Sequence, residues 1–343
     1  MPSLRPVSGS AEEILGLLRE WDAAEHPEPL VIQTSGSTGR PKRVVLSRDA
    51  MRASALATYE RLGGPGRWVL NLPPTYVAGV QVLYRSVVAD TEPLILGRRP
   101  LGELYGRLDG VDYISLVPTQ LIRMMRDDPP DGAYMLDGFR AVLIGGGPLD
   151  PRVRAEAEDR GIRIVQTYGM SETCGGCVYD GLPLDGVEMR IEDGQVLLRG
   201  PMLFDGYDGE PDRTTAALRD GWFHTDDLGH LDDRGCLRIE GRGDDVIISG
   251  GVKVPARAVA TALMTDRAAV AVEVVGVPDD EWGERVVAVV EARDPLTLAG
   301  LRDLVEPRSW APRQLVVVKQ IPLLSNGKPD RLAMRSLAAE EWR

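Results

Sequence analysis

The sequence of 343 residues is poor in cysteine and contains no long apolar run. The three cysteines, Cys174, Cys177 and Cys236, are too few for a framework of disulfide bonds and odd in number, so we expect free thiols. No run of 18 apolar residues occurs, and the opening segment MPSLRPVSGSAEE lacks the apolar core of a secretion signal. These absences predict a cytoplasmic protein without membrane insertion.

Histidine is also scarce, which excludes several common chemistries. His26, His224 and His230 do not form an H-E-x-x-H metal motif, and the G-x-S-x-G turn of serine hydrolases is absent. No G-x-G-x-x-G follows the first apolar run, which argues against a dinucleotide oxidoreductase. The pair Cys174-x-x-Cys177 has no further ligands nearby, so we interpret it as incidental rather than as a zinc or redox motif.

Positive charge is in deficit, with 40 Lys and Arg against 52 Asp and Glu and a net charge of −12. Nucleic acids and anionic membranes are bound by cation-rich surfaces, so neither is expected as a partner. The hydrophobic content of 43% is that of a globular protein, and the length is sufficient for more than one domain.

Short apolar runs alternate with helical patterns over the first part of the chain. The runs at 29–33, 67–72, 112–117 and 140–146 are followed by predicted helices at 47–63, 79–90, 118–127 and 149–161. This alternation predicts a parallel sheet covered by helices on both faces, with ligand loops at the carboxyl ends of the strands. The segments 34–43, 145–148 and 167–173 are expected at that edge.

The pattern changes after about Asp180 to short strands separated by Gly and Asp. A hairpin is predicted to turn at Asp193–Gly194, and two strands are predicted within 235–254. The last hundred residues show an α+β pattern, with helices near 255–264 and 298–305 and strands at 269–277, 284–292 and 314–321. The predicted fold class is therefore α/β, with a large N-terminal domain of parallel and mixed sheets, a β-rich subdomain, and a small α+β C-terminal domain.

The segment TSGSTGRPKR, Thr34–Arg43, has the composition of an anion-binding loop. Gly36, Gly39 and Pro41 prevent a regular helix or a central strand. Backbone N–H groups, hydroxyl side chains and Lys42 would together suit phosphate oxygens. The Walker pattern G-x-x-x-x-G-K-[ST] does not fit, and taken alone the segment is equally compatible with a surface connection.

This loop is the first of six motifs in the sequence. They are TSGSTGRPK at 34–42, GGGP at 145–148, QTYGMSET at 166–173, GWFHTDDLG at 221–229, GRGDDVIISGG at 241–251 and SNGKPDR at 325–331. In this order they resemble the motifs of the adenylate-forming (ANL) superfamily, which contains acyl- and aryl-CoA ligases, adenylation domains and luciferases. The resemblance implies an AMP-forming acid–thiol ligase that uses ATP, Mg²⁺ and CoA. It also implies an N-terminal domain at 1–241, truncated at its start, a hinge at 242–245 and a mobile C-terminal domain at 246–343.

The resemblance further implies a set of nucleotide-binding residues. They are Thr34, Ser35, Gly36, Ser37, Thr38, Gly39 and Lys42 at the phosphates, Gly145, Gly146, Gly147, Tyr168 and Gly169 at the adenine, and Asp227 and Arg242 at the ribose. Glu172 would hold Mg²⁺, and Ser171 stands where the family usually has threonine. Asp226 replaces the glycine that is common before the ribose-binding acid.

The resemblance assigns the chemical step to a lysine near the C-terminus. Attack of a carboxylate on the α-phosphate brings two anions together, and Lys328 matches the lysine that binds both during adenylation. Asp244 matches the hinge about which the small domain then rotates, and Gly250 and Gly251 would leave room for the pantetheine thiol. Ile248 stands where many members have lysine.

The chain is similar to the short o-succinylbenzoate–CoA ligases of actinobacteria, a family of menaquinone biosynthesis, because only about thirty residues precede its phosphate loop. That resemblance implies an acyl site at Tyr76, Gly79, Arg85 and Thr119, with Arg85 pairing with the second carboxylate of the acid. Tyr76 replaces a frequent histidine. From the residues alone, Arg85 among apolar positions needs an anion. The alternatives are that it lies on the polar side of a helix or pairs with a structural carboxylate.

The expected partners are therefore small molecules, namely ATP, CoA and an aryl dicarboxylic acid, together with a second copy of the chain in a homodimer. Three other functions stay open on the sequence. They are a ligase for another aryl or acyl acid, an adenylating or carrier-loading module that does not use free CoA, and a nucleotide-binding protein without catalysis. Arg85→Ala would favour the first of these if it left turnover of succinylbenzoate unchanged.

Overall fold

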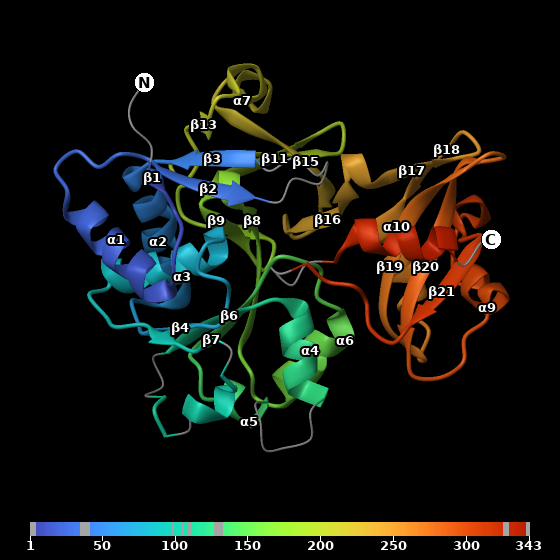
Figure 1. Ribbon diagram of the computed structural model, residues 1–343, viewed down its shortest axis with the longest axis horizontal. Helices are drawn as coiled ribbons and strands as arrows, with labels where there is room; N and C mark the ends of the chain where they lie inside the picture. The colour runs from blue at the N-terminus through green and yellow to red at the C-terminus, as the bar shows by residue number, and fades with distance from the viewer. Residues whose placement is uncertain are drawn as a thin grey trace. The chain divides into compact units, whose positions relative to one another are not determined.

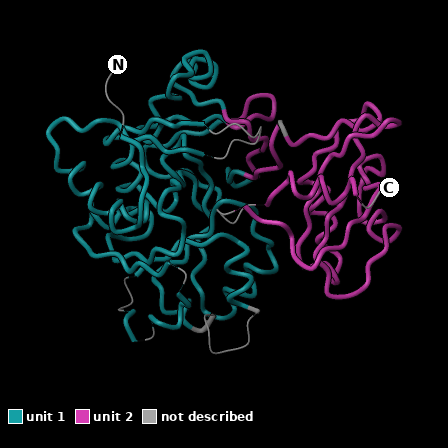
Figure 2. Tube along the Cα trace, viewed as in Figure 1, with its two compact units in different colours: residues 1–190, 197–224, 233–237 teal, residues 191–196, 225–232, 238–343 magenta. Residues whose placement is uncertain are grey.

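The computed structural model describes residues 5–34, 42–97, 99–104, 106–108, 112–126, 133–324 and 329–340. The chain divides into two compact units, shown in different colours in Figure 2. The first unit contains residues 1–190, 197–224 and 233–237. The second unit contains residues 191–196, 225–232 and 238–343.

A seven-stranded sheet forms the centre of the first unit (Figure 1). Its strands, in spatial order, are β10 (Leu182–Pro183), β9 (Gly175–Tyr179), β8 (Ile164–Met170), β7 (Ala141–Ile144), β6 (Tyr113–Leu116), β4 (Trp68–Leu70) and β5 (Leu94–Ile95). The strands from β8 to β5 are parallel, whereas β9 and β10 run antiparallel. The parallel sheet predicted from the apolar runs is confirmed for β4, β6 and β7.

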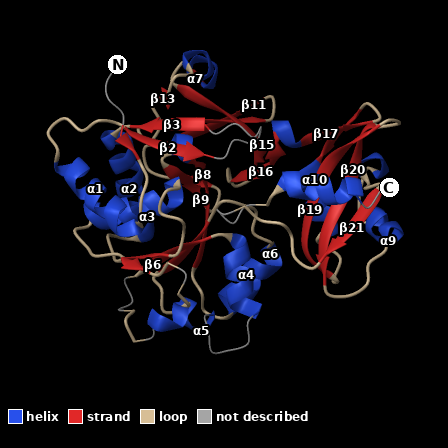
Figure 3. Cartoon of the chain, in the orientation of Figure 1, coloured by secondary structure: helices blue, strands red, loops and turns tan. Residues whose placement is uncertain are grey.

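Helices cover both faces of this sheet (Figures 1 and 3). The side chains of one face pack with α4 (Pro118–Arg126), α5 (Ala133–Leu136), α6 (Pro151–Asp159) and the short helix η1 (Leu101–Leu104) in one apolar cluster. On the other side lie α1 (Ala11–Ala23), α2 (Arg48–Leu62) and α3 (Val77–Val88), where α3 contacts β4 and β9. A sheet buried on both faces explains why the central strands β4 and β7 are apolar throughout.

Polar caps fix where these helices begin. The Ser47 side chain accepts a hydrogen bond from the Ala50 backbone at the start of α2, as expected. Asp150 caps α6, with Pro151 in the first helical position. Helix α1 was not predicted, although Ser10 and Glu13 form a capping box before it.

The prediction for the first apolar run is wrong. The run that ends at Thr34 does not belong to the parallel sheet, because β2 (Leu30–Thr34) pairs antiparallel with β3 (Lys42–Leu46). These strands form a separate sheet with the order β1 (Arg5–Pro6), β2, β3 and β13 (Gly206–Tyr207). The apolar residues after Lys42 form a second strand there, so the phosphate-loop segment connects two strands rather than a strand and a helix.

A further five-stranded sheet has the order β11 (Glu188–Glu192), β12 (Gln195–Arg199), β15 (Trp222–Leu231) and β14 (Leu218–Arg219), with β16 (Leu237–Arg242) also paired to β15. Helix α7 (Pro211–Ala217) precedes β14. The turn between β11 and β12 lies at the predicted position, where Asp193 and Gly194 have φ values of 48° and 81°. Positive φ at both positions is the requirement of a tight hairpin turn.

The second unit contains an α+β domain, as expected. Its sheet has the order β18 (Val252–Pro255), β17 (Val246–Ser249), β20 (Gly283–Ala292) and β19 (Ala269–Asp279), and β21 (Gln314–Val318) pairs parallel to β20. Helices α8 (Ala256–Leu263) and α9 (Leu298–Asp303) pack in one apolar cluster, and α10 (Arg331–Glu340) packs in another. Segment 235–254 contains three strands instead of the two predicted, because the turn at Gly250–Gly251 separates β17 from β18.

Among the helices in the described ranges, none combines the length and the apolar character needed to cross a membrane.

Candidate active site

Glu172 lies in a tight turn between β8 and β9. The turn is the 3-10 helix η2 (Ser171–Thr173), in which Thr173 Oγ1 accepts a hydrogen bond of 2.9 Å from the Met170 backbone. The same hydroxyl donates to the Gly175 carbonyl at 2.6 Å. These contacts hold the backbone on both sides of Glu172. The Glu172 residue itself is buried, with 6% of its surface exposed.

The Glu172 carboxylate receives two cationic or polar contacts on the same oxygen. The Tyr207 hydroxyl donates a hydrogen bond to Glu172 Oε1 at 2.9 Å. The ammonium nitrogen of Lys42 lies 3.9 Å from that oxygen and 5.7 Å from the centre of the Tyr207 ring. The phosphate-loop lysine and the acidic residue of the QTYGMSET motif, predicted to share a site, are therefore neighbours.

The antiparallel pairing of β2 and β3 brings the two ends of the phosphate-loop segment together. Thr34, the last residue of β2, is the Cα partner of Lys42, the first residue of β3. Both ends of the segment therefore lie beside each other, and Lys42 reaches Glu172. The predicted phosphate-binding residues Ser35, Gly36, Ser37, Thr38 and Gly39 lie outside the described residues, and their role stays a prediction.

The predicted adenine-binding residues come from two adjacent strands. Gly145, Gly146 and Gly147 directly follow β7, and Tyr168 and Gly169 belong to the end of β8, which is parallel to β7. A Cβ on Gly145 would lie 2.6 Å from Thr167 Oγ1, so glycine permits a close approach to β8. Gly146 has φ of 78°, a conformation that favours glycine.

Gly169→Ala tests how tightly β8 and β9 are packed. A Cβ at this position would lie 2.0 Å from the Gly175 carbonyl oxygen, which is backbone and cannot rotate away. We expect Gly169→Ala to destabilise the fold by about 2–3 kcal/mol, measured by chemical unfolding. Gly16→Ala is the matched control, because Gly16 is an exposed residue of α1 and nothing lies within 4 Å of its Cβ. It should stabilise the protein by about 0.5–1 kcal/mol, and equal effects of both changes would contradict this packing argument.

The predicted acyl-site residues Tyr76, Gly79 and Thr119 lie at the carboxyl ends of two parallel strands. Tyr76 precedes α3, and a Cβ on Gly79 would lie 2.2 Å from the Pro73 carbonyl oxygen. Thr119 is in the first turn of α4, after β6. The next residue, Gln120, donates from its side chain to the Asn71 carbonyl at 3.1 Å and so joins the segments that follow β4 and β6.

Arg85 lies inside the first unit, not on a polar surface of α3. The residue is 4% exposed, and its guanidinium lies 4.8 Å from the centre of the Trp68 ring. Nη2 is 3.4 Å from the Tyr179 hydroxyl, whereas Nε is buried without a hydrogen-bond partner. Within the described chain, no carboxylate forms an ion pair with Arg85. The structure therefore contradicts both alternatives for Arg85, a polar helix face and a structural ion pair among described residues.

The residues predicted at the ribose belong to the second unit. Arg242 donates to the Asp226 carboxylate at 3.1 Å, so the aspartate that replaces the family glycine is itself a partner of this arginine. The backbone N–H of Asp227 donates to Thr225 Oγ1 at 3.1 Å. This contact fixes the backbone at Asp227, and its predicted role at the ribose stays a prediction.

The predicted hinge and CoA-facing residues also belong to the second unit. Asp244 lies in the short helix η3 (Gly243–Asp245), and the next residue, Asp245, forms an ion pair with Arg331. Gly250 has φ of 58° and donates its N–H to the Trp282 carbonyl at 2.8 Å. Gly251 completes the turn with φ of 77°. Lys328 lies outside the described residues, so its catalytic role stays a prediction.

Two family models match this chain. The AMP-binding enzyme family matches residues 18–208, and the AMP-binding enzyme C-terminal domain matches residues 258–328. The chain belongs to the AMP-binding enzyme family. The resemblance inferred from the six motifs is thereby confirmed, and the α/β fold with a large N-terminal and a small C-terminal domain is the fold of that family.

Individual relatives are similar to most of this chain. The Mycobacterium tuberculosis protein named "Probable 2-succinylbenzoate--CoA ligase" is 42% identical over 356 residues, which cover 99% of this chain and 92% of that protein. The o-succinylbenzoate CoA synthetase MenE of Bacillus subtilis, solved with the acyl-adenylate OSB-AMP, is 27% identical, with a TM-score of 0.77 over 89% of this chain and 68% of that one. MenE has also been solved with ATP and a magnesium ion, with a TM-score of 0.75 over 88% of this chain and 69% of that one.

Tyr207 contacts Glu172 and was missed by sequence reasoning. It stands in the segment MLFDGYDG, outside the six motifs, and reaches Glu172 because β13 pairs with β3. No local signal identifies this role, because the partner Glu172 is 35 residues away in the sequence.

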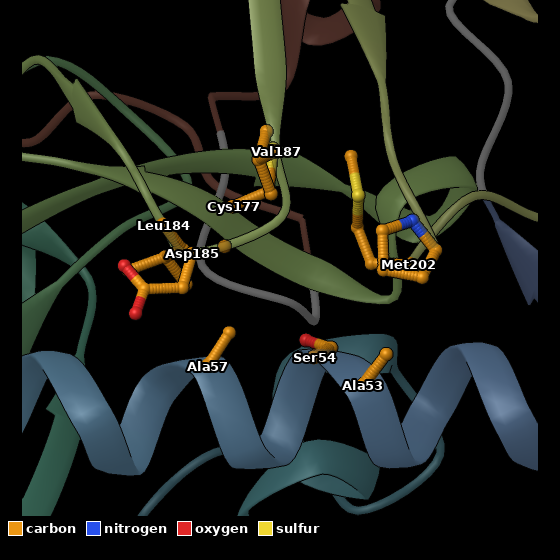
Figure 4. Close-up of a pocket in the computed structure, with 10 residues that line it drawn as sticks. Ala53, Ser54, Ala57, Cys177, Leu184, Asp185, Val187 and Met202 are labelled. Atoms are coloured by element: carbon orange, nitrogen blue, oxygen red, sulfur yellow. The ribbon is translucent and has the colours of Figure 1, made fainter.

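Figure 4 shows a small pocket between α2 and the chain around β9 and β10. Ala53, Ser54 and Ala57 point from α2 toward Cys177 and Met202. No residue predicted to bind nucleotide or acid is among the described residues that line this pocket. The pocket and the predicted site therefore have no described residue in common.

The cysteines are free thiols, as expected. Burial raises the pKa of the Cys177 thiol to about 12, and it also raises the pKa of Cys174. A thiol that keeps its proton at neutral pH is a poor nucleophile and a poor metal ligand. Among the described residues, no group of three or more His, Cys, Asp or Glu side chains is arranged to hold a metal ion.

Proposed function

We propose that this AMP-binding enzyme is a 2-succinylbenzoate–CoA ligase that forms an acyl-adenylate from the acid and ATP and then a thioester with CoA. The observation that carries the choice of acid is the buried Arg85, whose guanidinium has no carboxylate partner within the described residues. Buried charge is costly without a counter-ion. The second carboxylate of a dicarboxylic acid supplies one, and the similarity to relatives named for this substrate supports the same choice.

In the first step, an oxygen of the substrate carboxylate attacks the α-phosphorus of ATP and pyrophosphate leaves. Thr34, Lys42 and the loop between them bind the phosphates, and Lys328 places the carboxylate against the α-phosphate. Glu172 suits Mg²⁺, because a hard cation bound to nucleotide phosphates needs only one or two protein carboxylates. The metal, when bound, neutralises charge on the phosphate oxygens. Ser171 supplies a hydroxyl beside it.

The adenine and the ribose have separate sets of binding residues in this proposal. Gly145, Gly146, Gly147, Tyr168 and Gly169 bind the adenine, and Asp227 and Arg242 bind the ribose. In the second step, the CoA sulfur attacks the acyl carbon and AMP leaves. For this step the C-terminal domain at 246–343 rotates relative to residues 1–241 about the hinge at 242–245, with Asp244 at its centre. Lys328 then moves away, and Gly250 and Gly251 admit the pantetheine arm.

The acyl site in this proposal is formed by Tyr76, Gly79, Arg85 and Thr119. Gly79 allows the segment around Pro73 to pass close to α3, and the Tyr76 ring packs on the aromatic ring of the acid. The enzyme acts in the cytoplasm, where ATP and CoA are available. It forms a homodimer in this proposal, and no residue is assigned to the dimer interface.

A mass-spectrometric screen of carboxylic acids with ATP, Mg²⁺ and CoA tests this function. The expected result is formation of succinylbenzoyl-CoA, AMP and pyrophosphate with 2-succinylbenzoate and much weaker turnover of monocarboxylic aryl acids. Preferred turnover of a different acid would make the enzyme a ligase of that acid. Release of AMP without a thioester after CoA is added would instead identify an adenylating module that does not use free CoA.

A further inference from the structure

The contacts of Tyr207 show how the Glu172 carboxylate is oriented. Tyr207 is 7% exposed, and its hydroxyl donates to Glu172 Oε1 at 2.9 Å. The Lys42 ammonium lies 3.9 Å from the same oxygen. Both contacts therefore involve Oε1. The hydrogen bond from Tyr207 orients the carboxylate through this oxygen.

Several contacts hold the Tyr207 ring in place. Its backbone N–H donates to Thr214 Oγ1 at 2.8 Å, and Tyr207 is the Cα partner of Val44 in the β13–β3 pair. The Phe204 ring meets it edge-on at 4.9 Å, and the Arg213 guanidinium lies 4.9 Å from the ring centre. A tyrosine held at its backbone and ring presents its hydroxyl in one direction. This arrangement is that of a preorganised donor rather than of a mobile surface side chain.

The Lys42 contact is of a different kind. An ammonium–carboxylate distance of 3.9 Å is long for a direct hydrogen bond, so the attraction is mainly that of two opposite charges. Lysine acts as a point charge on a flexible stem and can change partners at little cost in geometry. Phosphate oxygens carry more negative charge than one carboxylate, so a nucleotide in the loop competes for Lys42.

We propose that Tyr207 is a positioning residue that holds Glu172 Oε1 so that the carboxylate meets the Mg²⁺ of the nucleotide, while Lys42 exchanges Glu172 for phosphate. This inference rests on the proposed function, because it assumes that Mg²⁺ and ATP bind here. Without nucleotide, Lys42 neutralises Glu172. With nucleotide, Lys42 leaves Glu172 to the metal, and Tyr207 remains as the neutral donor that keeps the carboxylate in place.

Tyr207→Phe tests this role by removing the hydroxyl and keeping the ring. We expect the Mg²⁺ concentration for half-maximal activity to rise about tenfold, with kcat at saturating Mg²⁺ within about twofold of wild type, because the lost bond involves a charged acceptor. Calorimetry should give a matching loss of about tenfold in ATP affinity with Mg²⁺ present, and no more than about a twofold change in EDTA. Tyr207→His, which keeps an N–H donor, should recover part of the Mg²⁺ dependence.

Tyr84→Phe is the matched control, because it removes another hydroxyl–carboxylate bond, from Tyr84 to Asp22 at 2.6 Å. It should leave the Mg²⁺ dependence unchanged. If Tyr207→Phe and wild type show the same Mg²⁺ dependence, or if the variant loses ATP affinity equally in EDTA, the role of Tyr207 is overturned. Absence of Mg²⁺-dependent ATP binding in the wild type would overturn the proposed function itself, which separates the two failures.

Discussion

Replacing Lys328 by alanine is expected to lower the rate of acyl-adenylate formation by a factor of about 10² to 10³. The reason is electrostatic, because the ammonium stabilises the charge that builds up as the carboxylate attacks the α-phosphate. The second step uses the opposite orientation of the C-terminal domain in our proposal. A preformed acyl-adenylate should therefore still be converted to the thioester by Lys328→Ala at a rate within a few-fold of wild type.

Rapid-quench assays with ATP and acid, and separately with synthetic acyl-adenylate and CoA, measure the two steps. Lys319→Ala is a suitable control, since Lys319 is an exposed lysine of the same unit outside the six motifs. It should leave both rates unchanged. Normal adenylation by Lys328→Ala would remove this lysine from the mechanism, and an equal loss in both steps would argue against a role confined to adenylation.

Replacing Arg85 by methionine is expected to reduce kcat/KM for 2-succinylbenzoate by about 10²-fold, because the second carboxylate would then enter a buried site without a counter-charge. For an analogue in which that carboxylate is a methyl ester, the same replacement should reduce kcat/KM much less. The same change should leave the free energy of unfolding equal or raised, since it removes a buried guanidinium that lacks a described carboxylate partner. Lower activity with unchanged or higher stability is the signature of a substrate contact.

Arg67→Met provides the contrasting control. Arg67 pairs at 2.9 Å with Asp112, whose side chain is fully buried, so its removal takes a cationic partner away from a buried carboxylate. We expect Arg67→Met to destabilise the protein by about 3 kcal/mol without changing the preference for the dicarboxylic acid. Strong destabilisation by Arg85→Met together with an unchanged preference would show that Arg85 has a structural role instead. The comparison requires kcat/KM of each variant for 2-succinylbenzoate and for its ester analogue. Urea unfolding of each variant gives the free energy of unfolding.

The sequence predicted well those features that depend on neighbouring residues. The apolar run at 140–146 contains a buried strand, and Asp150 and Pro151 mark the start of the next helix as their local chemistry requires. The turn at Asp193–Gly194 is another local feature, because positive φ is easily adopted there. Such elements need no information about the rest of the fold.

Features that depend on distant partners were predicted poorly. Leu30–Thr34 was assigned to the parallel sheet, since a short apolar run does not reveal which strand it pairs with. Tyr207 is 35 residues from Glu172, and only the pairing of β13 with β3 brings it to the carboxylate. The sequence left open whether Arg85 is buried, and its contacts with Trp68 and Tyr179 were not predicted, because they join different elements.

Exchange of radiolabelled pyrophosphate into ATP in the absence of CoA is the most direct measurement of the central claim, that this chain activates a dicarboxylic acid by adenylation. We predict exchange that requires Mg²⁺ and 2-succinylbenzoate and that is weak with the ester analogue. Exchange that proceeds without any acid, or that is supported equally by the ester analogue, would contradict the account.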